Sequence, residues 1–404
     1  MSEERVRGSA AEAARTIAPL ILVAAALLVS LNLRPGASSV GPVLDELRTG
    51  LSMPGGLAGA LTGLPGLCFG VGGALAVRLG RRAGLSGGIT IGLLLATAGL
   101  LARPFVAGPS AFLALSAVAL LGMAVGNILV PAWIKTCRGI EVRLMTIYGS
   151  GLIVGGSLGS LLTAPIAAAS GWRWSLGLWG LGAAAAAALW WWIARTERRR
   201  TPASPPSQAA PSGRIARSPT AIAMTALFAL QSMHAYIQMG WLPQIYRDAG
   251  LSASLAGAMQ ALLAAVTIVG GLTMPTVIAC GRGLAPMMLG LGALLATGYG
   301  GLLLAPAALP WLWAVLLGIS GFAFPLVIAL ITARTRSHEV TAQLSGFVQP
   351  VGYLLAALGP VLVGVIHAAT GGWEVVLWIL VATAVPFTLA GLRAVRPAVV
   401  DDEI

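Results

Sequence analysis

Long apolar segments alternate with short polar or basic segments from one end of the chain to the other. Most of the apolar segments have about 20 or more residues, the length that an α-helix needs to cross the ~30 Å hydrocarbon core of a bilayer. The residue-by-residue alternation that is typical of a membrane β-barrel does not occur in the sequence. We therefore expect an all-α polytopic membrane protein with twelve transmembrane helices, at residues 17–44, 55–77, 84–102, 109–134, 144–169, 174–194, 219–245, 253–279, 284–305, 309–332, 341–369 and 374–393.

The composition agrees with this pattern, because 57% of the 404 residues are hydrophobic and only 9% are charged. Soluble domains carry about 25% charged residues. The first apolar run, IAPLILVAAALLV, could pass for a signal peptide. However, the residues before it mix Glu with Arg, and eleven further apolar segments follow, so we interpret it as a retained first helix.

Net charge and cysteine content exclude other classes of protein. The net charge of +12 could suggest a nucleic-acid partner, but the basic residues lie between apolar segments and leave no soluble region for such a module. Cys68, Cys137 and Cys280 show no paired spacing and no neighbouring ligand cluster. We expect no disulfide framework, metal site or cofactor.

The distribution of basic residues predicts the orientation in the membrane. With the N-terminus inside, 20 of the 25 basic residues fall on the cytoplasmic side. The exceptions are Arg48, Arg103, Arg173 and Arg247, which fall outside, and Arg34, which falls within the first span. Cytoplasmic segments carry an excess of Lys and Arg, so we expect both termini in the cytoplasm.

A basic, Pro- and Ser-rich segment near the midpoint divides the chain into two similar parts. GLSMPGGLAGAL at 50–61 resembles GLSASLAGAMQAL at 250–262, and LLGM at 120–123 resembles LLGI at 316–319. The repeat predicts two pseudo-symmetric six-helix halves. The expected parts are an N-terminal tail (1–16), a first half (17–194), a flexible linker (195–218), a second half (219–393) and a C-terminal tail (394–404).

Arg34 is the one basic residue that falls within a span. The first span is bracketed by Arg15 and Asp45, whose midpoint is residue 30, so Arg34 lies about 6 Å beyond the centre of a helix. A charge at bilayer depth costs at least about 2.5–3.5 kcal/mol and persists where it faces a cavity or a partner. We place Arg34 inside the membrane, with a bend at Pro35 and Gly36. The alternative is a helix that ends at Leu33, with Arg34 reaching the outer interface.

The internal repeat gives Arg34 a counterpart. An offset of 200 residues places Arg34 opposite His234 and Ser38 opposite Gln238. Arg34 and Ser38 share one helix face, and so do His234 and Gln238, which predicts two polar stripes that line a central cavity. The alternative for His234 is a hydrogen-bonded packing residue.

Further polar residues in the spans are candidate hydrogen-bond partners for a solute. Gln349 and Tyr353 share one face of the eleventh span, and Asn127 lies on the fourth. The alternative is that these amides satisfy carbonyl groups of neighbouring helices. Glycines at helical spacing, such as Gly59 and Gly63, predict close helix packing.

All thirteen acidic residues fall in loops, tails or span ends. An interior arginine without an interior carboxylate favours an anionic or strongly dipolar solute over a cation. His234 is the only interior side chain that titrates near neutrality, so a coupling proton would fall to it. Symport, exchange and uniport all remain open.

Two six-helix halves joined by a basic linker resemble the major facilitator superfamily. LNLRP at 31–35, GNILVPAWIK at 126–135, WLPQIY at 241–246 and QPVGYLLAALGP at 349–360 resemble the cyanate and 2-nitroimidazole transporter family within it. The resemblance covers essentially all spans. RLGRRAG at 78–84 keeps the basic residues of the superfamily's loop signature but lacks the acidic one.

This resemblance implies transport by alternating access around one central site. The implied protein is a monomer in the bacterial cytoplasmic membrane, and its implied solute is small and cyanate-, nitrate- or nitroimidazole-like. The motif positions that the resemblance transfers to the site are Asn32, Arg34, Asn127 and Gln349. Ser38, His234, Gln238 and Tyr353 are expected there from the helix faces alone.

Three alternatives differ from this hypothesis. A drug or metabolite efflux transporter would have broader specificity, and a membrane sensor on the same fold would bind without transporting. A membrane-embedded enzyme would need a nucleophile with a base, or a metal cluster, inside the spans. The sequence supplies neither, so we expect no enzyme.

Overall fold

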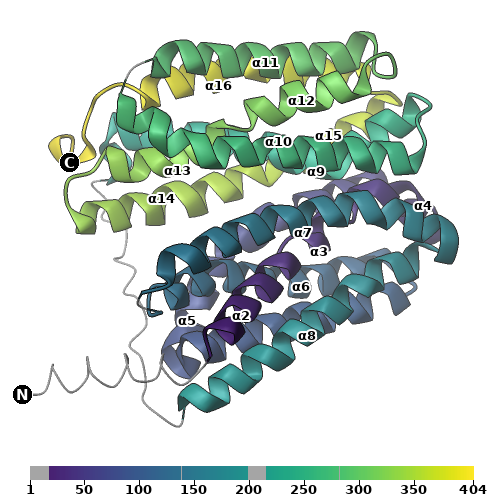
Figure 1. Ribbon diagram of the computed structural model, residues 1–404. Helices are drawn as coiled ribbons and strands as arrows, with labels where there is room; N and C mark the ends of the chain where they lie inside the picture. The colour runs from purple at the N-terminus through teal and green to yellow at the C-terminus, as the bar shows by residue number, and fades with distance from the viewer. Residues whose placement is uncertain (1–17, 138, 199–214, 282) are drawn as a thin grey trace, which may run out of the picture. The chain divides into compact units, whose positions relative to one another are not determined.

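A computed structural model of the protein describes residues 18–404 except 138, 199–214 and 282. The expected N-terminal tail (1–16) and most of the expected linker lie outside the described residues. The described part of the chain contains helices and no strand (Figure 1). The helices are α2 (Pro19–Asn32), α3 (Pro35–Ser38), η1 (Gly41–Val43), α4 (Leu44–Gly50), α5 (Gly55–Ala102), η2 (Arg103–Phe105), α6 (Pro109–Ile134), α7 (Glu141–Ser170), α8 (Trp172–Arg198), η3 (Ile215–Arg217), α9 (Pro219–Asp248), α10 (Ala253–Cys280), α11 (Leu284–Leu304), α12 (Pro310–Ser320), α13 (Ala323–Ala333), α14 (His338–Ala356), α15 (Leu358–Thr370), α16 (Glu374–Ala394) and η4 (Val400–Asp402).

Eleven helical segments of the described chain are long and apolar enough to cross a membrane. One of them includes α5, whose 48 residues would span about 72 Å at 1.5 Å per residue, more than twice the hydrocarbon thickness. Gly84 interrupts α5 with a φ of 75°, a backbone conformation that favours glycine. The predicted spans 55–77 and 84–102 therefore lie on either side of this kink, and the eleven segments accommodate all twelve predicted spans.

The first span is broken at the position that the sequence predicted. Pro35 has no amide hydrogen and disfavours helical backbone in the residue before it. Accordingly α2 ends at Asn32, Arg34 has a φ of −120°, and a new helical turn begins at Pro35. The candidate span continues through α3, η1 and α4 to Gly50, although α2 itself ends at Asn32 with Leu33 as its C-cap. Arg34 lies at a break within the span.

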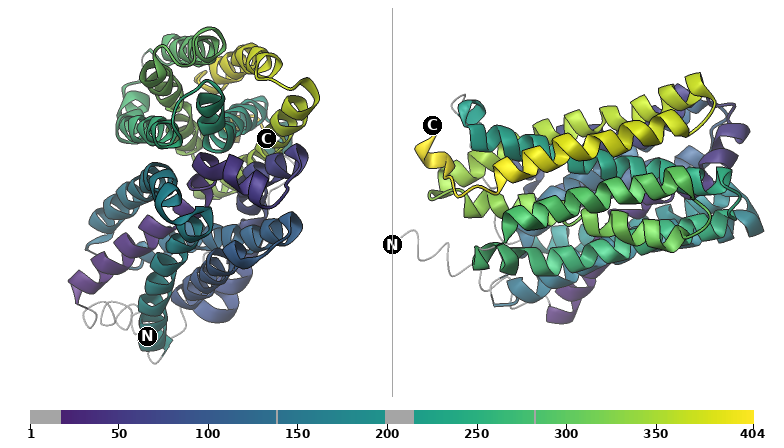
Figure 2. Two further views of the ribbon diagram at one scale, coloured as in Figure 1. Left: turned by 90° about the vertical axis from the view of Figure 1, so that its right-hand side faces the viewer. Right: turned by 90° about the horizontal axis from the view of Figure 1, so that it is seen from above.

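The chain forms two compact units, which we describe separately. Unit 1 comprises residues 1–39, 71–159 and 166–207, and unit 2 comprises residues 40–70, 160–165 and 208–404. In unit 2 the long helices run side by side, as the two views of Figure 2 show. The division into six-helix halves at 17–194 and 219–393 stays a prediction.

Glycines allow α7 to pack closely on α2 in unit 1. A Cβ atom at Gly151 would lie 2.0 Å from the Ser30 hydroxyl oxygen, and one at Gly155 would lie 2.3 Å from the Leu31 carbonyl oxygen. Real Cβ atoms do not approach other atoms this closely. The packing role expected for this glycine series is confirmed, and it brings α7 against the segment that carries Arg34.

A second glycine seam lies within unit 2, between the start of α5 and α14–α15. A Cβ atom at Gly59 would lie 2.9 Å from the Pro360 carbonyl oxygen, and one at Gly63 would lie 2.6 Å from that of Ala357. The same Pro360 carbonyl accepts a 3.1 Å hydrogen bond from Nε1 of the fully buried Trp241. This seam is therefore tightly packed.

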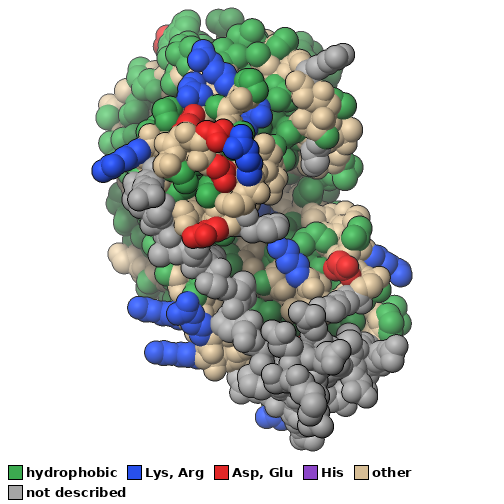
Figure 3. Space-filling model, turned by 90° about the vertical axis from the view of Figure 1, so that its left-hand side faces the viewer, with side chains coloured by type: hydrophobic (Ala, Val, Ile, Leu, Met, Phe, Trp, Pro, Cys, Tyr) green, Lys and Arg blue, Asp and Glu red, His purple; other side chains and the backbone are tan. Residues whose placement is uncertain are grey.

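Tryptophan side chains mark both ends of the spans. Trp174, Trp311 and Trp378, near the starts of α8, α12 and α16, are more than half exposed. Trp191 and Trp192 are exposed near the other end of α8. Tryptophan is enriched at both membrane interfaces. On the face shown in Figure 3, Lys and Arg side chains lie together with Asp and Glu side chains.

The last residues of the chain cap the start of α9. The Glu403 carboxylate accepts hydrogen bonds from the Ser218 hydroxyl and from the Thr220 amide (3.0 Å) and hydroxyl (2.8 Å). Arg336 holds Asp402 through two bonds of 2.6 and 2.9 Å. A carboxylate at a helix N-terminus is stabilised by the free amides and the helix dipole. The segment after α16 is thereby fixed to unit 2.

This cap should make stability depend on pH. Burial raises the pKa of Glu403, but the hydrogen bonds from Ser218 and Thr220 and the charge of Arg393 lower it overall, below its ordinary value of 4.5. Its contribution is therefore present above pH 4.5 and is lost as the pH falls through the folded pKa. We expect Glu403→Gln to lower thermal stability at about pH 7 and to have a smaller effect at a pH well below 4.5. Glu374→Gln, at an exposed carboxylate, is the control, and an effect of Glu403→Gln that is equal at both pH values would contradict the prediction.

Candidate functional site

Arg34 lies against α7 at the helix break. It is half-buried, and a Cβ atom at Gly156 would lie 3.4 Å from its Cβ. Ser38 faces the same place, because its hydroxyl donates a 2.9 Å hydrogen bond to the Gly156 carbonyl oxygen. Ser38 is only 3% exposed, so this hydroxyl holds the helical turn to α7. The shared face predicted for Arg34 and Ser38 is confirmed.

Asn127 borders the same helix further along. Its Oδ1 accepts a 2.8 Å hydrogen bond from the Tyr148 hydroxyl on α7, and both side chains lie within unit 1. Tyr148 and Gly156 are eight residues apart, about 12 Å along α7. Sequence reasoning missed Tyr148, although a tyrosine in the apolar fifth span was a signal.

Asn32 does not join this group. Its Nδ2 donates a 2.7 Å hydrogen bond to the Leu28 carbonyl oxygen of its own helix. A Cβ atom at Gly182 on α8 would lie 2.4 Å from its Oδ1, and the residue is only 8% exposed. Asn32 therefore faces α8, whereas Arg34 faces α7. Its contacts are those of a packing residue, the alternative that the sequence left open for buried amides.

A second arginine of unit 1 is buried beside the break. Arg103 is fully buried, and its Nη1 donates a 3.1 Å hydrogen bond to the Gly36 carbonyl oxygen. Its guanidinium carbon lies 5.6 Å from the centroid of the Phe112 ring. Sequence reasoning treated Arg103 only as a charge outside the membrane, because the apolar span ends one residue before it.

In unit 2, His234 belongs to a chain of hydrogen bonds between α9, α11 and α16. Gln238 Nε2 donates to the Tyr299 hydroxyl oxygen at 3.2 Å, and Tyr299 lies 3.1 Å from His234 Nδ1. His234 Nε2 lies 3.3 Å from Thr383 Oγ1, which itself donates to the Leu380 carbonyl oxygen at 2.6 Å. Both imidazole nitrogens are then satisfied if the Tyr299 hydroxyl donates to Nδ1 and His234 carries its proton on Nε2.

This arrangement differs from the one expected for His234 and Gln238. Both were predicted to line a central cavity, but His234 is 0% and Gln238 3% exposed, and both face α11 and α16. The repeat places His234 at the same depth along its helix as Arg34. It does not determine the direction in which the His234 side chain points. Because these hydrogen bonds engage both nitrogens of a neutral imidazole, the contacts of His234 are those of a hydrogen-bonded packing residue.

The face of α9 that contacts α14 carries aromatic residues instead. Tyr236 is two residues from His234, about 200° around the helix, and its ring centroid lies 6.2 Å from that of Tyr353. Tyr353 also lies 4.8 Å from Phe228 and 5.9 Å from Phe69. The predicted face of the eleventh span thus borders an aromatic cluster, which sequence reasoning did not anticipate.

Gln349 lies on the same helix as Tyr353 and is half-buried. Its Nε2 donates a 2.8 Å hydrogen bond to the Ser345 hydroxyl oxygen, one turn away, as their spacing predicted. Since Nε2 has a second hydrogen and the amide oxygen Oε1 is an acceptor, the Gln349 amide can both donate to and accept from a polar solute. Unit 2 therefore brings Gln349 and Tyr353 together and directs His234 and Gln238 elsewhere.

An ion-pair cluster lies at the end of unit 2 predicted to face outward. Arg247, at the end of α9, pairs with Glu46 at 2.7 Å and with Asp45 at 3.7 Å on α4. Its side chain is 19% exposed, so water screens the pairs only in part. These ion pairs and the Gly59 seam together hold the α4–α5 segment against α9 and α15. We call this set of contacts the outer seam.

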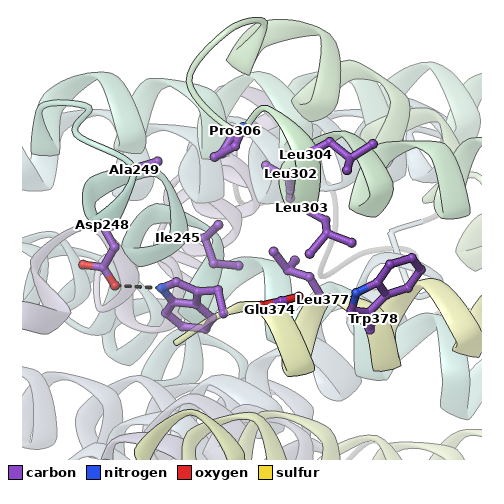
Figure 4. Close-up of a pocket in the computed structure, with 11 residues that line it drawn as sticks. Ile245, Asp248, Ala249, Leu302, Leu303, Leu304, Pro306, Glu374, Leu377 and Trp378 are labelled. Atoms are coloured by element: carbon purple, nitrogen blue, oxygen red, sulfur yellow. Dashed lines mark hydrogen bonds between the residues drawn. The ribbon is translucent and has the colours of Figure 1, made fainter. Parts of the chain in front are cut away.

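A cavity of about 390 Å³ lies nearby, where α9 and α11 end and α16 begins (Figure 4). Leucines and Trp378 form much of its lining, and Trp373 Nε1 donates a 2.7 Å hydrogen bond to Asp248 at its edge. None of the eight predicted site residues lines it. It is a separate feature from the candidate site.

Acidic side chains of the described chain lie at helix ends, as in the case of Glu197, which accepts a 3.0 Å hydrogen bond from Trp133 near the end of α8. The described residues contain no group of three or more His, Cys, Asp or Glu side chains that could hold a metal ion. The chemistry at the break in unit 1 is thus that of arginine, amide and hydroxyl groups.

Comparisons with known proteins agree with this architecture. The family model described as Major Facilitator Superfamily matches residues 20–355. The 2-nitroimidazole transporter of Escherichia coli (strain K12) is 32% identical over 384 residues, which cover 93% of this chain and 96% of that protein. The cyanate transport protein CynX of the same organism is 31% identical over 355 residues, covering 86% and 90%.

The fold is also that of a solved transporter. A crystal structure of a D-xylose-proton symporter matches with a TM-score of 0.73 over 95% of this chain and 99% of that one, at 14% identity. The protein is therefore a membrane transporter and not an enzyme. It belongs to the major facilitator superfamily and, within it, to the transporters similar to the cyanate and 2-nitroimidazole transporters.

Proposed function

We propose that this transporter moves a small anionic or strongly polar solute, of the cyanate-, nitrate- or nitroimidazole-like class, by alternating access. Arg34 anchors the negative or electron-rich group of the solute. The observation that carries this proposal is an arginine held at a helix break inside a membrane span. Backbone irregularity at membrane depth occurs where it is buried in protein or lines a water-filled cavity.

The guanidinium group suits such a solute. It presents planar, parallel N–H donors to oxygen or nitrogen acceptors and stays charged under all physiological conditions. Acidic side chains of the described chain lie at helix ends. The names of the two Escherichia coli relatives, which specify cyanate and 2-nitroimidazole, support the same class.

Two residues of unit 2 remain predicted solute contacts, taken by themselves. Gln349 offers an amide that can donate and accept, and Tyr353 offers a hydroxyl and an aromatic face. Aromatic rings such as those of Phe69 and Phe228 beside Tyr353 suit a planar solute. His234 and Gln238 are left out of the proposed site because Tyr299 and Thr383 already pair with both imidazole nitrogens and Tyr299 also pairs with Gln238 Nε2.

His234 is also an unsuitable proton carrier in this proposal. A second proton would convert Nδ1 from acceptor to donor and break its hydrogen bond from Tyr299. We therefore favour uniport or exchange over proton symport through His234.

The outer seam is the proposed outer gate of the transport cycle. We expect Arg247→Gln to weaken the seam, because Asp45 and Glu46 then lose their cationic partner. Partly exposed ion pairs contribute about 0.2–1 kcal/mol, which corresponds to an opening equilibrium up to about fivefold higher. The readout is labelling of a cysteine at Met53→Cys, a buried position next to the seam, after replacement of the three native cysteines.

A charge exchange separates gating from general damage. Arg247→Glu combined with Glu46→Arg restores an opposite pair, so labelling should return toward the wild-type rate. If the cysteine is labelled at the same rate in Arg247→Gln as in the unsubstituted background, the ion-pair cluster is not a gate.

Reconstituted proteoliposomes test the function directly. We expect saturable uptake and counterflow of labelled cyanate, nitrate or 2-nitroimidazole above the rate of protein-free liposomes. Thermal stabilisation by these compounds without counterflow would instead support a membrane sensor. Competition by lipophilic cations would support a broad efflux transporter.

A further inference from the structure

Arg103 is the most deeply buried charge in the described chain, and the proposed function does not yet use it. It lies in η2 directly after α5 and is 0% exposed. No carboxylate of the described residues lies within ion-pair distance of it, and its Nε and Nη2 have no hydrogen-bond partner there. Burying an unpaired charge is strongly unfavourable, so packing alone would select an apolar side chain here.

The one hydrogen bond that Arg103 makes goes to the turn beside Arg34. The helix α3 has only four residues, and the amide of its C-cap Ser39 serves the carbonyl oxygens of Pro35 and Ala37. Ser39 N–H donates to the Pro35 carbonyl oxygen at 2.9 Å. The Gly36 carbonyl oxygen receives Arg103 Nη1 at 3.1 Å. A charged donor makes this a stronger bond than a neutral one would.

The same turn is closely packed on its other sides. A Cβ atom at Gly36 would lie 2.2 Å from Met123 Cε and 3.1 Å from Leu100 Cδ2. Ser38 holds the turn to α7 through the Gly156 carbonyl. Arg103 therefore supplies the polar contact on the side of η2, where Phe112 covers its guanidinium.

We propose that Arg103 is a positioning residue of the transport site: it fixes the Pro35–Ser38 turn and thereby the direction in which the Arg34 side chain leaves the backbone. Gly36 is two residues from Arg34, so their Cα atoms are at most about 7.6 Å apart. A displacement of the turn therefore moves Arg34 directly. This inference rests on the role proposed above for Arg34.

The first test measures the turn itself and needs no substrate. We expect Arg103→Met to accelerate hydrogen exchange of the amides of Ser38, Ser39 and Val40 in the detergent-solubilised transporter. Arg173→Met is the matched control: Arg173 also bonds backbone carbonyls of this loop, at Pro104 and Val106, but it is exposed and does not contact Gly36. Exchange that is unchanged in Arg103→Met, or accelerated equally in Arg173→Met, overturns the proposal.

The second test asks whether Arg103 acts through Arg34. We expect Arg103→Met to raise the KM for cyanate about tenfold with a smaller change in kcat, and Arg103→Lys, which keeps the charge and one donor, to raise it less. In an Arg34→Lys background, Arg103→Met should change the KM by less than about twofold. Lysine lacks the planar guanidinium group that Arg103 is proposed to orient. An equal effect in both backgrounds overturns the proposal.

The two tests separate this inference from the proposed function. If the wild-type protein transports none of the probes, the transport proposal fails, and with it the role of Arg103 in transport. Faster exchange of the turn in Arg103→Met alone would then still support the structural role of Arg103. If Arg103→Met does not fold, the same measurements on Arg103→Lys and Arg103→Gln decide. Equal exchange and KM for these variants and the wild type would overturn the proposal.

Discussion

Arg34→Ala should reduce the specific uptake of cyanate or 2-nitroimidazole in proteoliposomes by about 100-fold or more. Each charge-assisted hydrogen bond contributes about 1.5–3 kcal/mol, and the loss of a bidentate contact removes two of them. Every 1.4 kcal/mol corresponds to a factor of about ten in affinity. Yield and thermal stability should change little, since Arg34 is half-buried and its Cβ contact with Gly156 remains in alanine.

Two further variants sharpen this result. Arg34→Lys keeps the charge but loses the planar fork, so uptake should be intermediate between Arg34→Ala and the wild type. Arg173→Ala removes an exposed arginine of the same unit and should leave uptake unchanged. Wild-type uptake by Arg34→Ala would refute the anchoring role.

Gly155→Ala should destabilise the protein and reduce transport, although it adds only one methyl group. The added Cβ would lie 2.3 Å from the Leu31 carbonyl oxygen and 2.9 Å from the Leu31 carbonyl carbon. Both are backbone atoms, so α7 and α2 must separate. Overpacking of this kind typically costs about 1–3 kcal/mol. Because Arg34 lies against Gly156, the separation should also displace the anchor.

The same helix offers a matched control. A Cβ atom at Gly149 would have no atom within 4 Å, so Gly149→Ala should be neutral or slightly stabilising. Thermal unfolding in detergent and uptake in proteoliposomes compare the two variants. Equal stability and uptake for Gly155→Ala and Gly149→Ala would show that the α2–α7 contact is not tight.

Part of the candidate site was predictable because it depends on local backbone rules. Pro35 favours the break at Arg34, because it disfavours helical backbone in the residue before it, and the i, i+4 spacing puts Arg34 and Ser38 on one side. Spacing likewise placed Gln349 one turn from Ser345. These are properties of one helix, which the sequence contains in full.

Other side chains point in directions that differ from the predicted ones, because a neighbouring helix determines where they pack. The repeat aligned His234 with Arg34, but Tyr299 and Thr383 come from distant segments and draw the imidazole toward α11 and α16. Tyr236, which has no polar counterpart in the first span, takes the face toward Tyr353. A repeat conserves position along the helix, whereas the direction of each side chain depends on its partners.

The sequence by itself determined that this protein is a helical membrane protein, because bilayer thickness, the cost of buried charge and the properties of proline act on the chain locally. It determined the break at Arg34 for the same reason. Only the tertiary structure decided that Arg103 is buried against Gly36, that Arg247 closes the outer seam with Asp45 and Glu46, and that His234 packs within unit 2. These contacts join residues 67, about 200 and 65 positions apart, and no local pattern records which of the many polar groups at one depth will meet.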